Sequence, residues 1–240
     1  MNLLFLDTET TGLGKEDRLI QLAYKLRRPI SLDFAEPQVE YFRPPLPISF
    51  DAMATHHITN AMVEDKAPFV DSEFKKFLTE RVEDSIFVAH NAPFDLRMLA
   101  AEGVQFQNFV DTQRVCMHLI DSPSYRLQYL RYSLDMRVLG TAHDAAGDVN
   151  VLVALFDHLY SLVEQSIKSS DKTAIIDRMM TLSTLPVLLK KFTFGKYINR
   201  TFEDVAITDK GYLSWLYSSE MGKMEDERNQ DLLHTIKQYL

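Results

Sequence analysis

Short apolar runs, separated by turns and helix-like segments, fill the first half of the chain. Five segments carry the alternating or continuously apolar pattern of β-strands: residues 2–6, 18–26, 39–44, 85–90 and 108–112. Between them, residues 69–83 have helical spacing, and residues 92–103 predict a helix that ends at Gly103. Strands that alternate with helices indicate a layered α/β domain.

From residue 113 onward the apolar spacing is helical almost throughout, with a long helix predicted from about Ala145 to about Val163. The polar, serine-rich segment 165–173 is a candidate linker. It would divide the chain into a domain of residues 1–165 and a small C-terminal module of residues 174–240. A module of that size has a marginal core, so we expect it to dock on the first domain or on another copy.

Composition narrows the class of protein. With 240 residues, of which 46% are hydrophobic, the chain can bury a sizeable core. The N-terminal run is too short for a signal peptide, and we expect no membrane-spanning stretch and no membrane partner. The single cysteine, Cys116, excludes an internal disulfide, and a cytoplasmic setting is expected. A net charge of −8 counts against a protein that coats nucleic acid, but not against an enzyme that grips a few nucleotides.

Three short motifs place acidic residues next to predicted element ends: DTETTG with Asp7 and Glu9, HNAPFD with Asp95, and HDAAGD with His143 and Asp148. Side chains two apart in a strand share a face, so Asp7 and Glu9 can reach one ion. Taken singly, each motif has a plain structural reading as a strand-end turn or a helix cap.

Together, the three motifs resemble the DEDDh family of 3′-to-5′ exonucleases over residues 1–165, and residues 182–217 are similar to the C-terminal module of exonuclease X-type members. The resemblance implies a ribonuclease H-like three-layer fold with a mixed five-stranded sheet, followed by a small α+β module. It also implies hydrolysis of phosphodiester bonds from the 3′ end of nucleic acid, with single-stranded DNA favoured over RNA. A homodimer is an open expectation.

By this resemblance, two Mg²⁺ or Mn²⁺ ions would be held by the four acids Asp7, Glu9, Asp95 and Asp148. His143 would take the proton from the attacking water, because an imidazole titrates near neutral pH. The terminal nucleotide would lie against the residues implied for substrate binding: Thr10, Leu13, Phe94 and His56. Oxygen-only ligands suit these hard cations.

Other interpretations stay open at this point. A non-catalytic module that binds nucleic-acid ends or a polymerase, and an aspartyl phosphatase with Asp7 as nucleophile, are the alternatives. For His56 a helix-cap role is equally expected, and Asp111 is expected to be structural. Residues 186–200 carry four cations and three aromatic residues, and we favour a module core with a solvated basic face over a nucleic-acid surface.

Overall fold

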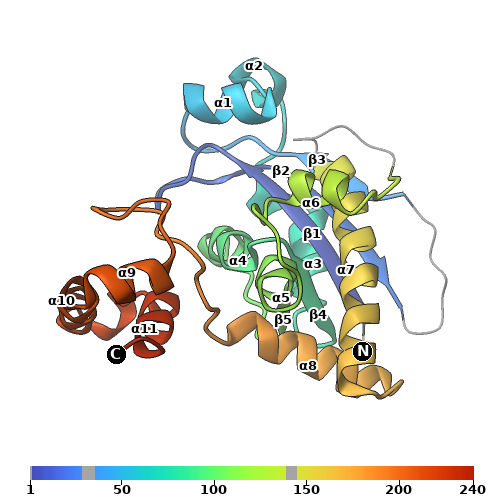
Figure 1. Cartoon of the computed structure of the whole chain (residues 1–240). Coiled ribbons are helices and arrows are strands. Elements are labelled where there is room, and N and C mark those ends of the chain that lie inside the picture. Colours follow the sequence, from blue (N-terminus) through green and yellow to red (C-terminus); the bar gives the residue numbers. More distant parts are fainter. Residues whose placement is uncertain (1, 29–35, 139–144) are drawn as a thin grey trace. The chain divides into compact units, whose positions relative to one another are not determined.

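The computed structural model describes residues 2–28, 36–138 and 145–240. A five-stranded mixed sheet forms the centre of its first compact unit, residues 1–183 (Figure 1). Its strands are β1 (Asn2–Thr10), β2 (Leu19–Arg27), β3 (Gln38–Tyr41), β4 (Ser85–Ala89) and β5 (Phe109–Asp111). In the order β3-β2-β1-β4-β5, β2 runs antiparallel to both of its neighbours, whereas β4 is parallel to β1 and β5 is parallel to β4. The five predicted strands and the mixed α/β sheet are therefore confirmed.

Alternation along β1 explains why helices cover both faces of the sheet. Leu4 and Leu6 enter a core with α3 (Glu73–Thr79) and α4 (Ala92–Ala101). Phe5 points the other way, and its ring lies edge-on to that of Phe156, with centroids 5.1 Å apart. Four helices form this second layer: α5 (Thr112–Leu119), α6 (Leu127–Ser133), α7 (Ala145–Ile167) and α8 (Lys172–Thr184).

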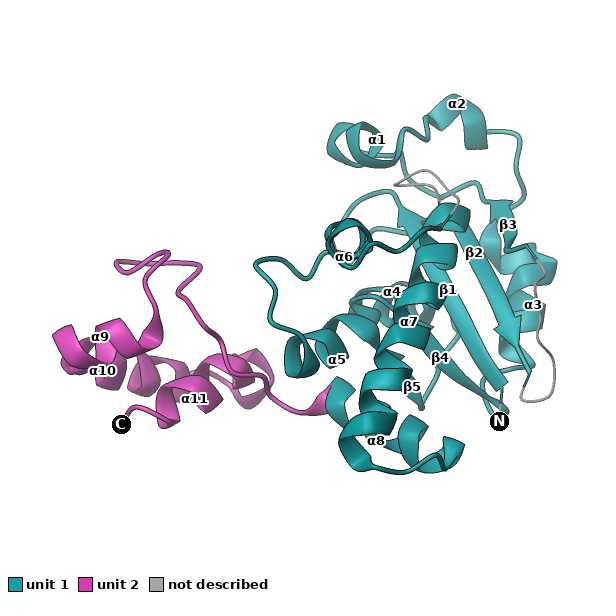
Figure 2. Cartoon of the chain, turned by 45° about the vertical axis from the view of Figure 1, so that its right-hand side comes forward, with its two compact units in different colours: residues 1–183 teal, residues 184–240 magenta. Residues whose placement is uncertain are grey.

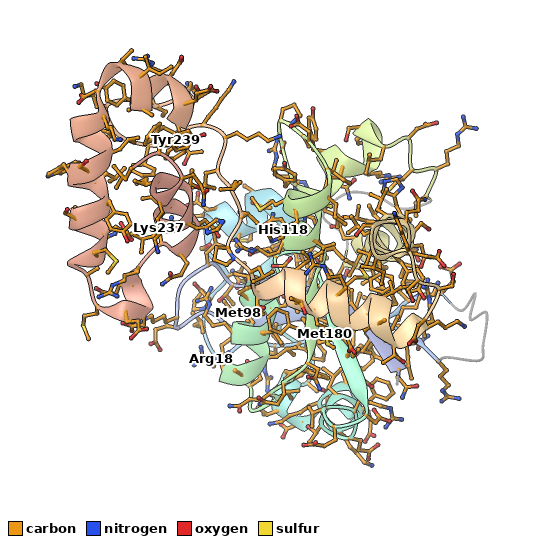
Figure 3. The ribbon with its side chains drawn as sticks, turned by 60° about the horizontal axis from the view of Figure 1, so that its bottom comes forward. Arg18, Met98, His118, Met180, Lys237 and Tyr239 are labelled. Atoms are coloured by element: carbon orange, nitrogen blue, oxygen red, sulfur yellow. The ribbon has the colours of Figure 1, made fainter. Side chains whose placement is uncertain are left out.

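Smaller elements complete the first unit. The helices α1 (Phe50–His56) and α2 (Asn60–Val63) cover a cluster of Ile20, Ile48, Ile58 and Val63, and η1 (Phe69–Asp71) precedes α3. Figure 3 marks one methionine from each layer of the unit, Met98 on α4 and Met180 on α8. The site is therefore built on a sheet whose strands are fixed from both sides.

The long helix α7 spans Ala145–Ile167, and Ala145 is the first residue described after 138, so the helix is confirmed along its length and extends past the predicted end near Val163. Its length and mean hydropathy of 1.2 meet the criteria for a membrane span, which corrects the expectation that no stretch would do so. The reason is that one of its faces lies against the sheet: Val149, Leu152, Leu155 and Leu159 are all buried. The apolar composition is that of a core helix.

The chain divides into two compact units, residues 1–183 and residues 184–240, which Figure 2 draws in teal and magenta. This boundary lies beyond the polar segment expected to be the linker. Residues 168–171 only connect α7 to α8, and α8 belongs to the first unit because Ile175, Met179 and Leu182 are buried in the same core as α7.

The second unit contains α9 (Phe202–Thr208), α10 (Lys210–Met221), η2 (Glu225–Glu227) and α11 (Gln230–Lys237), the helix near whose end Figure 3 labels Lys237 and Tyr239. All of its residues are described, and its β structure is a single bridge between Lys191 and Thr201, so the expected α+β character is slight. The stacked rings of Phe192 and Phe202, with centroids 4.0 Å apart, anchor its core.

Asp209 links residues 194–197, with the sequence FGKY, to α10 through hydrogen bonds. Its carboxylate accepts hydrogen bonds from the Tyr197 hydroxyl at 2.6 Å, the Lys196 ammonium at 3.1 Å and the backbone N–H of Tyr212 at 3.1 Å. Gly195 has φ of +69°, and a Cβ there would lie 2.9 Å from the Tyr212 hydroxyl oxygen, so glycine is required. The motif thus has a structural role, in agreement with the reading favoured from the sequence.

Candidate active site

Three carboxylates gather where β1 approaches the start of α7. Asp7 and Glu9 share the face of β1 that carries Phe5, which is the face covered by α7. Asp148 lies in the first turn of α7. One ligand oxygen from each of the three lies within 4.8 Å of the others, close enough for a single cation to contact all of them.

Two glutamine side chains fix this junction. Gln21 pairs with Glu9 across β1 and β2, and its side-chain oxygen accepts a hydrogen bond from the backbone N–H of Ala145 at 3.5 Å. On α6, the Gln128 amide nitrogen donates to Asp148, while the Gln128 oxygen accepts from Arg131 at 3.3 Å. Arg131 therefore turns the amide so that its N–H group faces the Asp148 carboxylate.

The three acids line a cavity of about 560 Å³, to which His90 and residues of α6 also contribute. His90 follows β4, and its Nε2 donates to the Tyr125 carbonyl at 2.7 Å, while its Nδ1 lies 2.9 Å from the Thr112 hydroxyl. Burial lowers the pKa of His90 to about 4. A neutral ring with both nitrogens engaged is a structural support rather than a proton acceptor.

Asp95 is not one of the three gathered acids, because it comes from the opposite layer. It lies on α4, is 4% exposed, and its Oδ1 accepts a hydrogen bond from the Thr8 hydroxyl at 2.6 Å. Thr8 points away from the face of Asp7 and Glu9. Burial raises the pKa of Asp95 to about 7, although the Thr8 hydroxyl partly opposes this.

Asp111 has the structural role expected for it. Its Oδ1 caps α5 by accepting from the N–H groups of Gln113 at 2.9 Å and Arg114 at 3.4 Å. The same oxygen accepts from the N–H of Asn91, at 3.0 Å, a residue with φ of 68° that begins α4. Asp111 thereby holds the HNAPFD turn in position.

Two of the residues implied for substrate binding, Thr10 and His56, are buried supports of the β1 end. The Thr10 hydroxyl donates to the Gly12 carbonyl at 2.7 Å. His56 accepts the Ile58 N–H at Nδ1, so its Nε2 carries the proton and faces the Thr10 carbonyl at 3.2 Å. Both residues hold the backbone directly after Glu9.

Leu13 and Phe94 are joined by Arg97. Leu13 is 79% exposed, on a loop whose Thr11 hydroxyl and Gly14 N–H both donate to Asp17 at 2.6 Å. The Arg97 guanidinium donates to the carbonyls of Leu13 and Gly14 at 3.1 and 3.0 Å and lies 5.4 Å from the centre of the Phe94 ring. The exposed leucine is therefore presented by a loop that hydrogen bonds hold in place.

His143 lies outside the described residues, so its position relative to the acids is not part of this geometry. The sequence analysis did not foresee the contribution of α6. Arg126, Gln128, Tyr129 and Tyr132 all line the cavity of the acids. No local signal in the sequence distinguishes them from other polar helix residues, because the packing of α6 on α7 decides where they point.

The fold and the gathered acids define an α/β enzyme of the nuclease type, and comparison with known sequences gives the family. The sequence model "Exonuclease" matches residues 4–156, and "Exodeoxyribonuclease X-like C-terminal" matches residues 192–219. The chain belongs to this exonuclease family and is a 3′-to-5′ exonuclease.

Individual relatives agree with this assignment. Exodeoxyribonuclease 10 of Escherichia coli K12 is 30% identical over 99% of this chain and 98% of its own length. The DNA polymerase III subunit epsilon of Rickettsia conorii is 27% identical over 74% of this chain and 82% of its own. A solved structure of exonuclease X with 5′ overhanging duplex DNA has the same fold, with a TM-score of 0.56 and 24% identity over 75% of this chain and 99% of that one.

Proposed function

We propose that this protein removes nucleotides from the 3′ end of DNA, with single-stranded ends favoured, in a reaction that depends on Mg²⁺ or Mn²⁺. The observation that carries the proposal is the convergence of Asp7, Glu9 and Asp148 on one point. The names of the relatives support DNA as the substrate, since one is an exodeoxyribonuclease and one structure contains duplex DNA with an overhang.

The donor set suits hard divalent cations. Three carboxylates within 4.8 Å supply only oxygen ligands, and the chain's single cysteine is buried elsewhere. We assign Asp7, Glu9 and Asp148 as direct ligands and Asp95 as support for a second ion through water. When bound, the ions would lower the pKa of the attacking water and neutralise charge on the phosphate.

The remaining side chains orient the reactants. His143 accepts the proton of the attacking water, which is the role of a general base near neutral pH. Gln128 keeps the Asp148 carboxylate turned towards the other acids. Leu13 and Phe94 hold the terminal nucleotide by apolar contact and stacking, and Thr10 and His56 fix the backbone that follows Glu9.

Digestion of 5′-labelled single-stranded DNA tests the proposal. With Mg²⁺ or Mn²⁺ the label should move stepwise to shorter products, and excess EDTA should stop the reaction. Asp7→Ala and His143→Ala should each lose most of the activity while keeping the circular dichroism spectrum of the wild type. Unchanged digestion by Asp7→Ala would remove the mechanism, and equal digestion of single-stranded RNA would remove the preference for DNA.

A further inference from the structure

Arg126, the residue directly before α6, places a cation in the wall of the cavity. Arg126 is exposed and lines the same cavity as Asp7, Glu9 and Asp148. Among residues 2–28, 36–138 and 145–240, no hydrogen bond or ion pair engages its guanidinium. A free arginine beside several carboxylates is unusual, because an ion pair with one of them would be the simplest arrangement.

Arg131, on the same helix, shows what a structural arginine looks like here. Its guanidinium donates to the Gln128 side chain at 3.3 Å and to the Val138 carbonyl at 2.5 Å. Arg131 is therefore committed to holding α6 and Asp148 in place. By contrast, no described residue takes a donor of the Arg126 guanidinium, and a planar guanidinium in a cavity wall can bind two phosphate oxygens at once.

Two tyrosine rings accompany Arg126. Tyr129 and Tyr132 are three residues apart, so they share a face of α6, and both line the cavity. They are 37% and 74% exposed, which is high for aromatic side chains in a cavity wall. Exposed rings next to a cation form the combination that binds single-stranded nucleic acid, since every base offers a face for stacking.

The position of these residues in the fold decides which nucleotide they would contact. Phe94, assigned to the terminal nucleotide, packs in the layer of α3 and α4. By contrast, α6 packs with α7 in the other layer, and the acids lie at the end of β1 between them. A strand whose scissile phosphate is at the acids and whose 3′ nucleotide is at Phe94 would continue, in the 5′ direction, towards α6.

We propose that Arg126, Tyr129 and Tyr132 form a subsite for the nucleotide on the 5′ side of the scissile phosphate. Arg126 binds its phosphodiester, and the two rings stack on its base. The inference rests on the proposed function, because the position of the scissile phosphate follows from the metal site.

Two substrates separate this subsite from the catalytic centre. One is a short single-stranded oligodeoxynucleotide. The other is the 4-nitrophenyl ester of thymidine 5′-monophosphate, in which nitrophenol replaces the whole strand on the 5′ side. Arg126→Gln and Tyr132→Ala should each lower kcat/KM on the oligonucleotide, relative to kcat/KM on the ester, by about tenfold, mainly through KM. Tyr132→Phe keeps the ring and should lose less than Tyr132→Ala.

The matched control is Arg137→Gln, which removes an exposed arginine that pairs with Asp135 and does not line the cavity. It should leave both substrates unaffected. An equal loss on both substrates in the α6 variants, or no loss on either, would overturn the subsite while the exonuclease proposal stands. A wild-type protein that cleaves neither substrate would overturn both.

Discussion

Removing one charge from the acid cluster should make the metal-free protein more stable. Asp7 lies within 4.8 Å of ligand oxygens of both Glu9 and Asp148. Two ionised carboxylates at that separation repel by about 1 kcal/mol at the dielectric constant of water and by about 3 kcal/mol at an effective value near 20. Asp7 and Glu9 are partly exposed, so the water value applies more closely, and Asp7→Asn should raise the unfolding free energy in EDTA by about 2 kcal/mol.

Added Mg²⁺ should make the wild type more stable to unfolding than Asp7→Asn. A ligand that binds only the folded state stabilises it by about 2.7 kcal/mol at a hundredfold excess over its Kd. We expect that gain for the wild type, and little of it for Asp7→Asn. The assay is urea unfolding followed by far-ultraviolet circular dichroism, with and without Mg²⁺.

The control for this experiment is Asp177→Asn, which removes an exposed charge on α8 away from the cluster. It should change neither the unfolding free energy in EDTA nor the increase in that free energy when Mg²⁺ is added. The reasoning is refuted if Asp7→Asn is less stable than the wild type in EDTA, or if both proteins gain equally from Mg²⁺.

Three further predictions concern side chains around the site. Arg97→Gln removes two hydrogen bonds to the Leu13 and Gly14 carbonyls, so amide exchange in that loop should accelerate and KM for DNA should rise; an unchanged exchange rate would contradict this role. The pKa of His90 is about 4 in the folded protein and about 6.5 in the unfolded chain, so the fold favours the neutral ring. The contribution of His90 to the free energy of unfolding is therefore complete above pH 6.5 and is lost as the pH falls towards 4. Urea unfolding at several pH values should show that the free energy of unfolding of the wild type falls by up to about 3 kcal/mol more than that of His90→Gln over this range. Parallel plots of unfolding free energy against pH for the two proteins would refute the prediction. Burial raises the pKa of Cys116 to about 12, so the thiol should react with Ellman's reagent only after unfolding, and rapid labelling of the native protein would contradict its burial.

Local sequence predicted the strands and the first half of the site well, because strand alternation is a local property. The D-x-E spacing alone puts Asp7 and Glu9 on one face of β1, and the apolar pattern predicts the long helix α7 that carries Asp148. The same alternation assigns Thr8 to the other face. Its consequence, that Asp95 bonds to Thr8 instead of joining the other acids, follows only once α4 is known to cover that face.

Other features depended on packing between distant segments and could not be read locally. The polar stretch 165–173 looked like a domain linker, but the buried side chains of α8 return the chain to the first core. Likewise, the Gln128 contact with Asp148 needs α6 to pack on α7. In the second unit, Lys196 is exposed as the sequence predicted, but its hydrogen bond to Asp209 depends on the packing of α10 and could not be read locally.

The central claim is that acids from β1 and α7 together hold a divalent cation. Its most direct test is a titration of metal-free protein with Mn²⁺, followed by the paramagnetic resonance signal of the free ion, for the wild type and for Asp148→Asn. The account predicts that the wild type takes up Mn²⁺ and that Asp148→Asn, with one ligand of the cluster neutralised, binds it far more weakly. Equal uptake by the two proteins would contradict it.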